Sequence, residues 1–119
     1  MVLAARFRFR ERASAESLRQ ATAEHLAMRK RRQPLTRPTA GSVFKGTGDG
    51  QPAGRLIDEA GLKGLRIGGA VVSEKHANWI ENHGGAKAAD VRALIARIQE
   101  RVKARTGIFL EPEVRMLPP

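Results

Sequence analysis

The feature that most constrains the fold is a run of apolar residues near the C-terminal end whose spacing is typical of one helix face. These residues are Val91, Leu94, Ile95, Ile98 and Val102. The opposite face is mostly charged, and Gly107 after the run is typical of a helix end. An amphipathic helix has to bury its apolar stripe against another layer, so the rest of the chain must supply one.

The segments before and after this helix are short enough to be strands or single turns. Residues 67–72 and 77–80 are apolar and predict two strands joined through SEKH. Residues 53–60 predict a short helix that ends at Gly61, with Leu56 and Ile57 facing inward. Residues 108–117 predict a last strand in which Pro112 lies at an edge or a bulge.

The N-terminal part predicts two more elements and a long loop. Residues 2–10 alternate, which favours a strand with Leu3, Phe7 and Phe9 facing inward. A helix is expected from the cap Ser14 to about residue 30, before Pro34. Residues 33–52, rich in proline and glycine, are expected to be loop. The fold class is therefore α+β: a small mixed or antiparallel sheet packed against two longer helices and one short helix.

The charge balance is strongly basic, with 22 Lys and Arg against 12 Asp and Glu, or +10 formally. Such a balance suits nucleic acid, whose phosphates attract clustered cations, and it equally suits a small polyanion such as a nucleotide diphosphate. Proteins that bind single strands place aromatic residues among the basic ones. Here aromatic residues make up 4% of the chain and lie in apolar contexts, which weakens the nucleic-acid interpretation.

Several classes of site are disfavoured by composition. The chain has no cysteine, so it has neither disulfides nor thiolate metal ligands. Its three histidines lack the spacing of a metal site on one helix face, and we predict no metal. No apolar run approaches the roughly 20 residues that span a bilayer, and the N-terminus does not resemble a signal peptide. We expect a cytoplasmic location and no membrane contact.

Three local patterns each leave two interpretations open. The cluster GTGDG (46–50) can cradle phosphate through backbone amides or form a plain turn, and it lacks the lysine of a P-loop. Glu111 and Glu113 share one face of the predicted last strand, as a catalytic pair or as solvated residues. His76 and Asn78 either bind a ligand or hold the turn between two strands.

The order of four motifs along the chain is more specific than any of them alone. They are QPLTRPTAGSVFK (33–45), AGRLIDEAGLKG (53–64), GGAVVSEKHAN (68–78) and LEPEVR (110–115). Together they resemble the C-terminal part of UDP-N-acetylenolpyruvoylglucosamine reductase, the flavoenzyme that makes UDP-N-acetylmuramate for peptidoglycan. The resemblance covers residues 2–117. It implies an oxidoreductase that uses FAD, with NADPH as the reductant.

The resemblance also implies roles for two residues of the chain. In that family, a hydride adds to the terminal methylene of the enolpyruvyl ether, and the serine of AGS protonates the neighbouring carbon. That serine is Ser42 here. The second carboxylate of LEPEVR, Glu113, is implied to assist at the substrate carboxylate, and we hypothesise that it is neutral and donates a hydrogen bond. We expect Ser42 and Glu113 at opposite ends of a single cavity.

Substrate contacts are implied for five further residues. Arg32, Gln33 and Lys45 surround the serine motif and suit the diphosphate of a UDP-sugar. His76 and Asn78 of KHAN are substrate-binding candidates that can equally be structural. The chain departs from the family after FK, where many relatives have Asn-Pro and this chain has Gly-Thr.

The resemblance finally implies how the chain is organised. Residues 1–10 are expected to be a strand left from a preceding flavin-binding region, and residues 11–119 the C-terminal substrate-binding domain. In the family, two preceding domains hold FAD and carry a catalytic arginine. We therefore expect this chain to need a flavin-binding half, in cis or in trans, and to be inactive alone. The alternative is a basic, non-catalytic module that keeps the fold and binds nucleic acid or a partner subunit.

Overall fold

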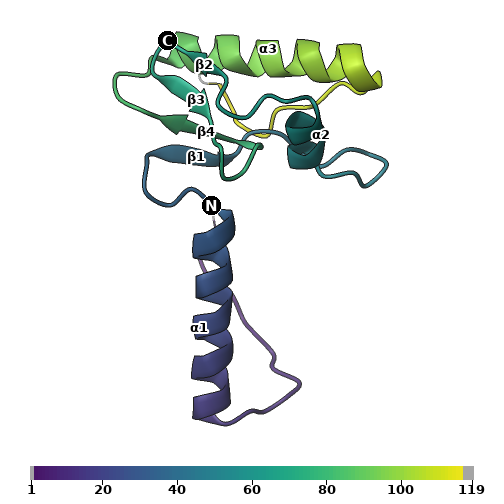
Figure 1. Cartoon of the computed structure of the whole chain (residues 1–119). Helices are drawn as coiled ribbons and strands as arrows, with labels where there is room; N and C mark the ends of the chain where they lie inside the picture. Colours follow the sequence, from purple (N-terminus) through teal and green to yellow (C-terminus); the bar gives the residue numbers. More distant parts are fainter. Residues whose placement is uncertain (1, 117–119) are drawn as a thin grey trace. The chain divides into compact units, whose positions relative to one another are not determined.

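A computed structural model of the chain describes residues 2–116, which form two compact units, one up to Arg31 and one from Arg32 onward. Three helices and four strands follow one another along the chain (Figure 1). They are α1 (Ala15–Arg32), β1 (Thr39–Ser42), α2 (Ala53–Glu59), β2 (Arg66–Ile67), β3 (Ala70–Val72), β4 (Trp79–Asn82) and α3 (Ala88–Thr106). The predicted α+β class is confirmed.

The first unit contains α1, except for its last residue, and the irregular segment before it. Its N-terminal cap is as predicted, since the Ser17 N–H donates to Ser14 Oγ at 3.1 Å. None of the residues of α1 is buried. The assignment of residues 1–10 and 11–119 to different regions of an enzyme stays a prediction, and Met1 and residues 117–119 lie outside the described residues.

The strand predicted over residues 2–10 is wrong. Residues 2–13 have no regular secondary structure. Leu3, Phe7 and Phe9, which were expected to face inward, are exposed. An alternating pattern becomes a strand only when another strand pairs with its backbone, and no strand of the described chain pairs with this segment.

The second unit is built on a four-stranded antiparallel sheet with the strand order β1-β4-β3-β2. The single strand expected over 67–72 is a hairpin instead, in which β2 and β3 are joined by Gly68 and Gly69. Gly69 lies so close to the backbone of Gly84 and Ala86 that a Cβ atom there would collide with it. Only glycine fits at this turn.

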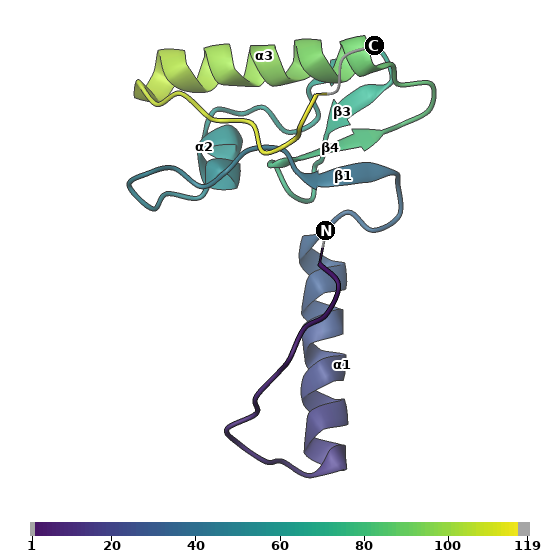
Figure 2. The same ribbon diagram turned by 180° about the vertical axis from the view of Figure 1, so that it is seen from behind.

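One face of the sheet is covered by α3, which contacts β2, β3 and α2 (Figures 1 and 2). The predicted apolar stripe is buried at Leu94, Ile95, Ile98 and Val102. Gly107 ends the helix with φ 76°, the left-handed conformation expected for a helix terminator. The predicted short helix is also confirmed in α2, where the Leu56 and Ile57 side chains are buried.

The chain after α3 turns back beneath the helix (Figure 2) and pairs with the segment that follows β1. The Glu113 N–H donates to the Val43 carbonyl at 2.8 Å, and the Lys45 N–H donates to the Glu111 carbonyl at 2.9 Å. The strand expected over 108–117 is thus reduced to one bridge between Phe44 and Pro112, and Leu117 lies outside the described residues. The loop expected over 33–52 is likewise corrected, since β1 and this bridge lie within it.

Candidate functional site

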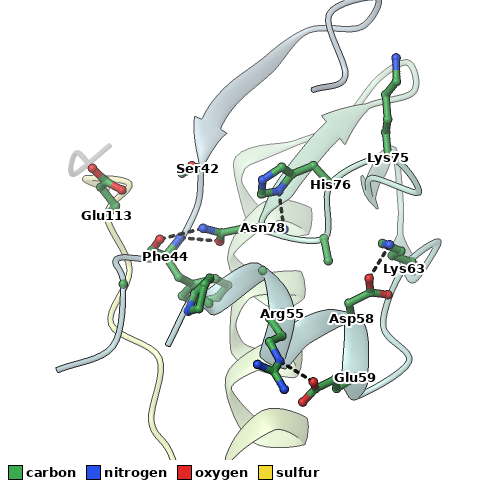
Figure 3. Close-up of a pocket in the computed structure, with 15 residues that line it drawn as sticks. Ser42, Phe44, Arg55, Asp58, Glu59, Lys63, Lys75, His76, Asn78 and Glu113 are labelled. Atoms are coloured by element: carbon green, nitrogen blue, oxygen red, sulfur yellow. Dashed lines mark hydrogen bonds and ion pairs between the residues drawn. The ribbon is translucent and has the colours of Figure 1, made fainter. Parts of the chain in front are cut away.

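A pocket of about 830 Å³ opens in the second unit, between the end of β1, the start of α2 and the turn before β4 (Figure 3). Its polar and charged lining comes from segments far apart in the sequence. These residues are Ser42, Arg55, Asp58, Glu59, Lys63, Lys75, His76, Asn78 and Glu113. Four of the seven residues predicted for the site therefore line one pocket.

Ser42 and Glu113 both face this pocket, although 70 residues separate them in the chain. Figure 3 shows them on adjoining segments at the same side of the pocket, not at opposite ends. A second hollow of about 530 Å³ is also lined by both residues, together with Arg115. Both side chains are exposed to solvent in the chain by itself. The hydroxyl and the carboxyl are thus accessible to the same bound molecule.

Asn78 is turned toward the backbone, not toward the open space. Its Oδ1 accepts from the Phe44 N–H, its Nδ2 donates to the Phe44 carbonyl, and both distances are 2.9 Å. The backbone carbonyl of Asn78 also accepts from the Val43 N–H at 2.9 Å. Asn78 is 7% exposed. Of the two interpretations left open by the sequence, the structural one fits these contacts.

His76 presents one ring nitrogen to the pocket wall. Its Nδ1 lies 3.3 Å from the Asn78 N–H, so in the neutral ring Nδ1 accepts and Nε2 carries the hydrogen. Partial burial is the main cause that lowers the pKa of His76 below its ordinary 6.5, and the Lys63 charge adds to it. His76 is therefore a neutral hydrogen-bond donor at neutral pH.

A close approach of α2 helps to hold the His76 ring. A Cβ atom added at Gly54 would meet His76 Cε1 at 3.2 Å and Asn78 Cβ at 3.4 Å. The Trp79 ring lies on another side, with its centroid 6.0 Å from that of His76. The KHAN turn is thus packed against the start of α2, which places His76 beside the pocket.

The three other predicted substrate contacts do not line either hollow that contains Ser42. Lys45 forms an ion pair with Glu111. Arg32 is the exposed last residue of α1, and Gln33 after it is half-buried. Glu111 thus pairs with Lys45 and does not line the pocket that contains Glu113.

The wall opposite Ser42 carries charged residues that sequence reasoning missed (Figure 3). Arg55 pairs with Glu59 at 2.7 Å, and Lys63 pairs with Asp58 at 2.6 Å. The Glu59 carboxylate raises the pKa of Arg55. The spacing of four between Arg55 and Glu59 on a predicted helix was a signal for one pair, but nothing in the sequence indicated that this face borders the pocket.

The glycine cluster 46–50 forms a turn whose polar groups bond to one another. The Thr47 N–H donates to the Gln51 carbonyl at 3.2 Å, and the Gly50 N–H donates to the Thr47 carbonyl at 2.9 Å. Hydrogen bonds from Thr47 and then Gln51 lower the pKa of Asp49. Backbone amides used inside the turn, and a carboxylate within it, do not suit a phosphate. The plain-turn interpretation fits these contacts.

Within residues 2–116, no group of three or more His, Cys, Asp or Glu side chains is arranged to hold a metal ion. In the same part of the chain, no helix combines the length and the apolar character needed to cross a membrane.

Comparison with known proteins assigns the family. Residues 33–117 match the family model described as UDP-N-acetylenolpyruvoylglucosamine reductase, C-terminal domain. The reductase of Syntrophotalea carbinolica is 52% identical over 117 residues, which cover 98% of this chain and 38% of that protein. The reductase of Heliobacterium modesticaldum is 54% identical over 102 residues, covering 86% of this chain and 32% of that protein.

A solved structure agrees with the sequence matches. The crystal structure of UDP-N-acetylenolpyruvylglucosamine reductase from Thermus caldophilus is similar, with a TM-score of 0.76 and 44% identity, over 91% of this chain and 37% of that one. The chain thus spans less than two fifths of the length of these relatives. The family model, which matches residues 33–117, falls on the unit that carries the sheet, Ser42 and Glu113. The chain belongs to the family of the C-terminal domain of UDP-N-acetylenolpyruvoylglucosamine reductase.

Proposed function

We propose that this chain supplies the substrate-binding and proton-donating domain of a reductase that converts UDP-N-acetylglucosamine enolpyruvate to UDP-N-acetylmuramate in peptidoglycan synthesis. The observation that carries the proposal is that Ser42 and Glu113, brought together from the AGS and LEPEVR motifs, line one pocket. A cytoplasmic location is part of the same proposal.

The flavin belongs to another part of the enzyme in this proposal. The chain's one glycine-rich cluster, residues 46–50, is bonded within itself and does not suit FAD. We therefore assign FAD, and the use of NADPH as reductant, to a flavin-binding half in cis or in trans. That half supplies the hydride that adds to the terminal carbon of the enolpyruvyl double bond.

Ser42 completes the reduction by giving up a proton. Once a hydride has added to the terminal carbon, the electron pair of the double bond resides on the neighbouring carbon and the adjoining carboxylate. That carbanion is basic enough to take the proton from a hydroxyl, which is a weak acid. The C–H bond forms as the Ser42 O–H bond breaks, and the alkoxide regains a proton from water. Stabilisation of the alkoxide by Lys45 is weakened by the ion pair of Lys45 with Glu111.

Glu113 stabilises the charge that builds up on the substrate carboxylate. In the neutral form it donates a hydrogen bond that strengthens as the negative charge grows. His76 offers a neutral Nε2–H to the substrate from the neighbouring wall. Arg32, Gln33 and Lys45 remain proposed contacts of the diphosphate from outside the pocket.

The test mixes the chain with a separately produced flavin-binding half and follows NADPH oxidation and product formation. We expect Ser42→Ala to lower kcat by roughly 10²–10⁴-fold, the range for loss of a general acid. Glu113→Gln keeps a hydrogen-bond donor and should retain much of the rate that Glu113→Ala loses. Ser17→Ala, the same change on exposed α1, is the control. Wild-type kcat in Ser42→Ala would refute the proposal.

Calorimetry on the chain alone separates this function from the basic binding module. Binding of UDP-N-acetylglucosamine enolpyruvate should depend only modestly on salt. Binding of an oligonucleotide that weakens steeply with salt, in the absence of sugar-nucleotide binding, would instead support the non-catalytic module.

A further inference from the structure

The amide of Asn78 is buried at the back of the pocket, where it bonds to the backbone N–H and carbonyl of Phe44. We propose that Asn78 is a positioning residue, which fixes Ser42 and Glu113 relative to each other by holding the backbone of Phe44. The inference rests on the proposed function for its catalytic consequence, but the placement itself can be tested without turnover.

Three hydrogen bonds join the residue pair 43–44 to Asn78. The Asn78 amide bonds to both the N–H and the carbonyl of Phe44, as Figure 3 shows, and the Asn78 carbonyl takes the Val43 N–H. Phe44 is 1% exposed, so its backbone groups have no water to replace a lost partner. The side chain therefore determines where this segment lies.

The same segment carries both reactive side chains. Ser42 is two residues before Phe44. Glu113 is attached from the other side, because its N–H donates to the Val43 carbonyl at 2.8 Å and Pro112 bridges to Phe44. A shift of Phe44 thus moves the Ser42 hydroxyl and loosens the pairing that holds Glu113. Among residues 42–45, 76–79 and 111–114, Asn78 is the residue whose side chain bonds to both the N–H and the carbonyl of Phe44.

The two hydrogen bonds between the Asn78 amide and the Phe44 backbone, called the clamp below, require an amide side chain of this length. The Phe44 N–H needs an acceptor and the Phe44 carbonyl needs a donor, and an amide side chain offers the two from neighbouring atoms of one planar group. Aspartate keeps the acceptor but sets a carboxylate against the carbonyl. Leucine has a similar shape and makes neither bond. Glutamine is one methylene longer, in a site with little free space.

Asn82 provides a matched control at the other end of β4. Its Oδ1 accepts from the Gly84 N–H at 2.8 Å and from the Ala86 N–H at 3.2 Å. It too holds a turn with two backbone hydrogen bonds, but none of these bonds involves residues 42–45 or 111–114. Asn82→Leu therefore reports the loss of a structural asparagine that is not part of the clamp.

The first arm measures residue-resolved amide hydrogen exchange on the whole 119-residue chain, normalised to the global unfolding free energy of each variant. In Asn78→Leu we expect exchange at Phe44, Lys45 and Glu113 to accelerate by roughly tenfold or more beyond the global effect. In Asn82→Leu the acceleration should be confined to Gly84 and Ala86. If Asn78→Leu fails to fold, Asn78→Asp takes its place. Unchanged protection at Lys45 and Glu113 would overturn the inference.

The second arm separates kcat from KM in the chain reconstituted with its flavin-binding half. Misplacement of a proton donor should lower kcat of Asn78→Leu by about tenfold to a hundredfold with KM little changed, whereas Asn82→Leu should retain kcat. If Ser42→Ala is inactive but Asn78→Leu keeps full kcat, the positioning role fails and the proposed function stands. If Ser42→Ala is fully active, the proposed function fails and the exchange arm alone decides whether the clamp exists.

Discussion

The two long helices of this chain are almost equal in length, 18 residues in α1 and 19 in α3, yet they have opposite relations to a core. Four apolar residues of α3 are buried, and no residue of α1 is. On the face of α1 that carries Leu18 and Leu26, the positions between them include the small residues alanine and threonine. This face therefore offers little apolar area. Helical spacing therefore predicts a helix in both places, but only the bulk of the α3 stripe predicts a packed one.

The difference predicts different sources of stability. The hydrogen bonds of α1 are supported by local contacts such as the Ser14 cap, whereas α3 is held by burial against the sheet. Helices without tertiary packing are marginal in water. We expect α1 to open at a much lower free energy than the second unit. Trp79, the single tryptophan, lies in β4 and reports on the second unit alone.

The largest effect is expected from removing a core side chain of α3. Leu94 is fully buried, and Leu94→Ala should lower the free energy of unfolding by about 3 kcal/mol, through lost transfer and the cavity left behind. Leu26→Ala removes the same atoms from exposed α1 and should change the free energy of unfolding by less than about 0.5 kcal/mol. Urea denaturation followed by Trp79 fluorescence measures both. Equal losses would mean that α1 packs as α3 does.

An intermediate effect is expected at the helix ends. Gly107 ends α3 at φ 76°, so Gly107→Ala should cost about 1 kcal/mol in the same denaturation. Ser14→Ala removes the cap of α1, and it should lower the helical signal in far-UV circular dichroism without moving the Trp79 transition. A shift of that transition in Ser14→Ala would show that the two units unfold together.

The smallest effect concerns pH and compares His76 with His25 of α1. Burial lowers the folded-state pKa of His76 below 6.5, so below that pH the unfolded chain binds more protons than the folded one. The contribution of His76 to stability is present in full from about one pH unit above 6.5, and it is lost as pH falls through the folded-state pKa. The stability of wild type relative to His76→Gln should therefore decline as pH falls below about 7.5. His25→Gln corrects for the removal of an imidazole, and a profile shared by both variants would contradict the assignment.

The elements predicted correctly are those whose signal is local. The α3 stripe, the Gly107 terminator and the inward pair Leu56 and Ile57 are all read within one or two turns of chain. Strand β1 was missed because TAGS has no strand pattern of its own and is ordered by pairing with β4. Residues 2–10 have the alternating pattern of a strand, but no strand of the described chain pairs with them. The periodicity of one segment does not show whether a distant segment will pair with it.

The residues of the candidate site also differ in whether a local signal identifies them. Ser42 and Glu113 were named from motif order, and the structure brings them to one pocket. The charged wall from Arg55 to Lys63 was missed because α2 turns its polar side toward the pocket, which depends on how the short helix sits in the unit. Asn78 was named as a substrate-binding candidate from the KHAN motif, but the direction of its amide depends on a segment 34 residues away.

The return of the tail to Phe44 has a consequence for how the protein is made. The bond between Lys45 and Glu111 spans 66 residues, and the chain between them includes most of the sheet and all of α3. Closing a loop of this length costs chain entropy, and we therefore expect this contact to form late in folding. During synthesis, Ser42 leaves the ribosome before Glu113 is translated. A chain that ended after α3 would lack Glu113, which lines the same pocket as Ser42.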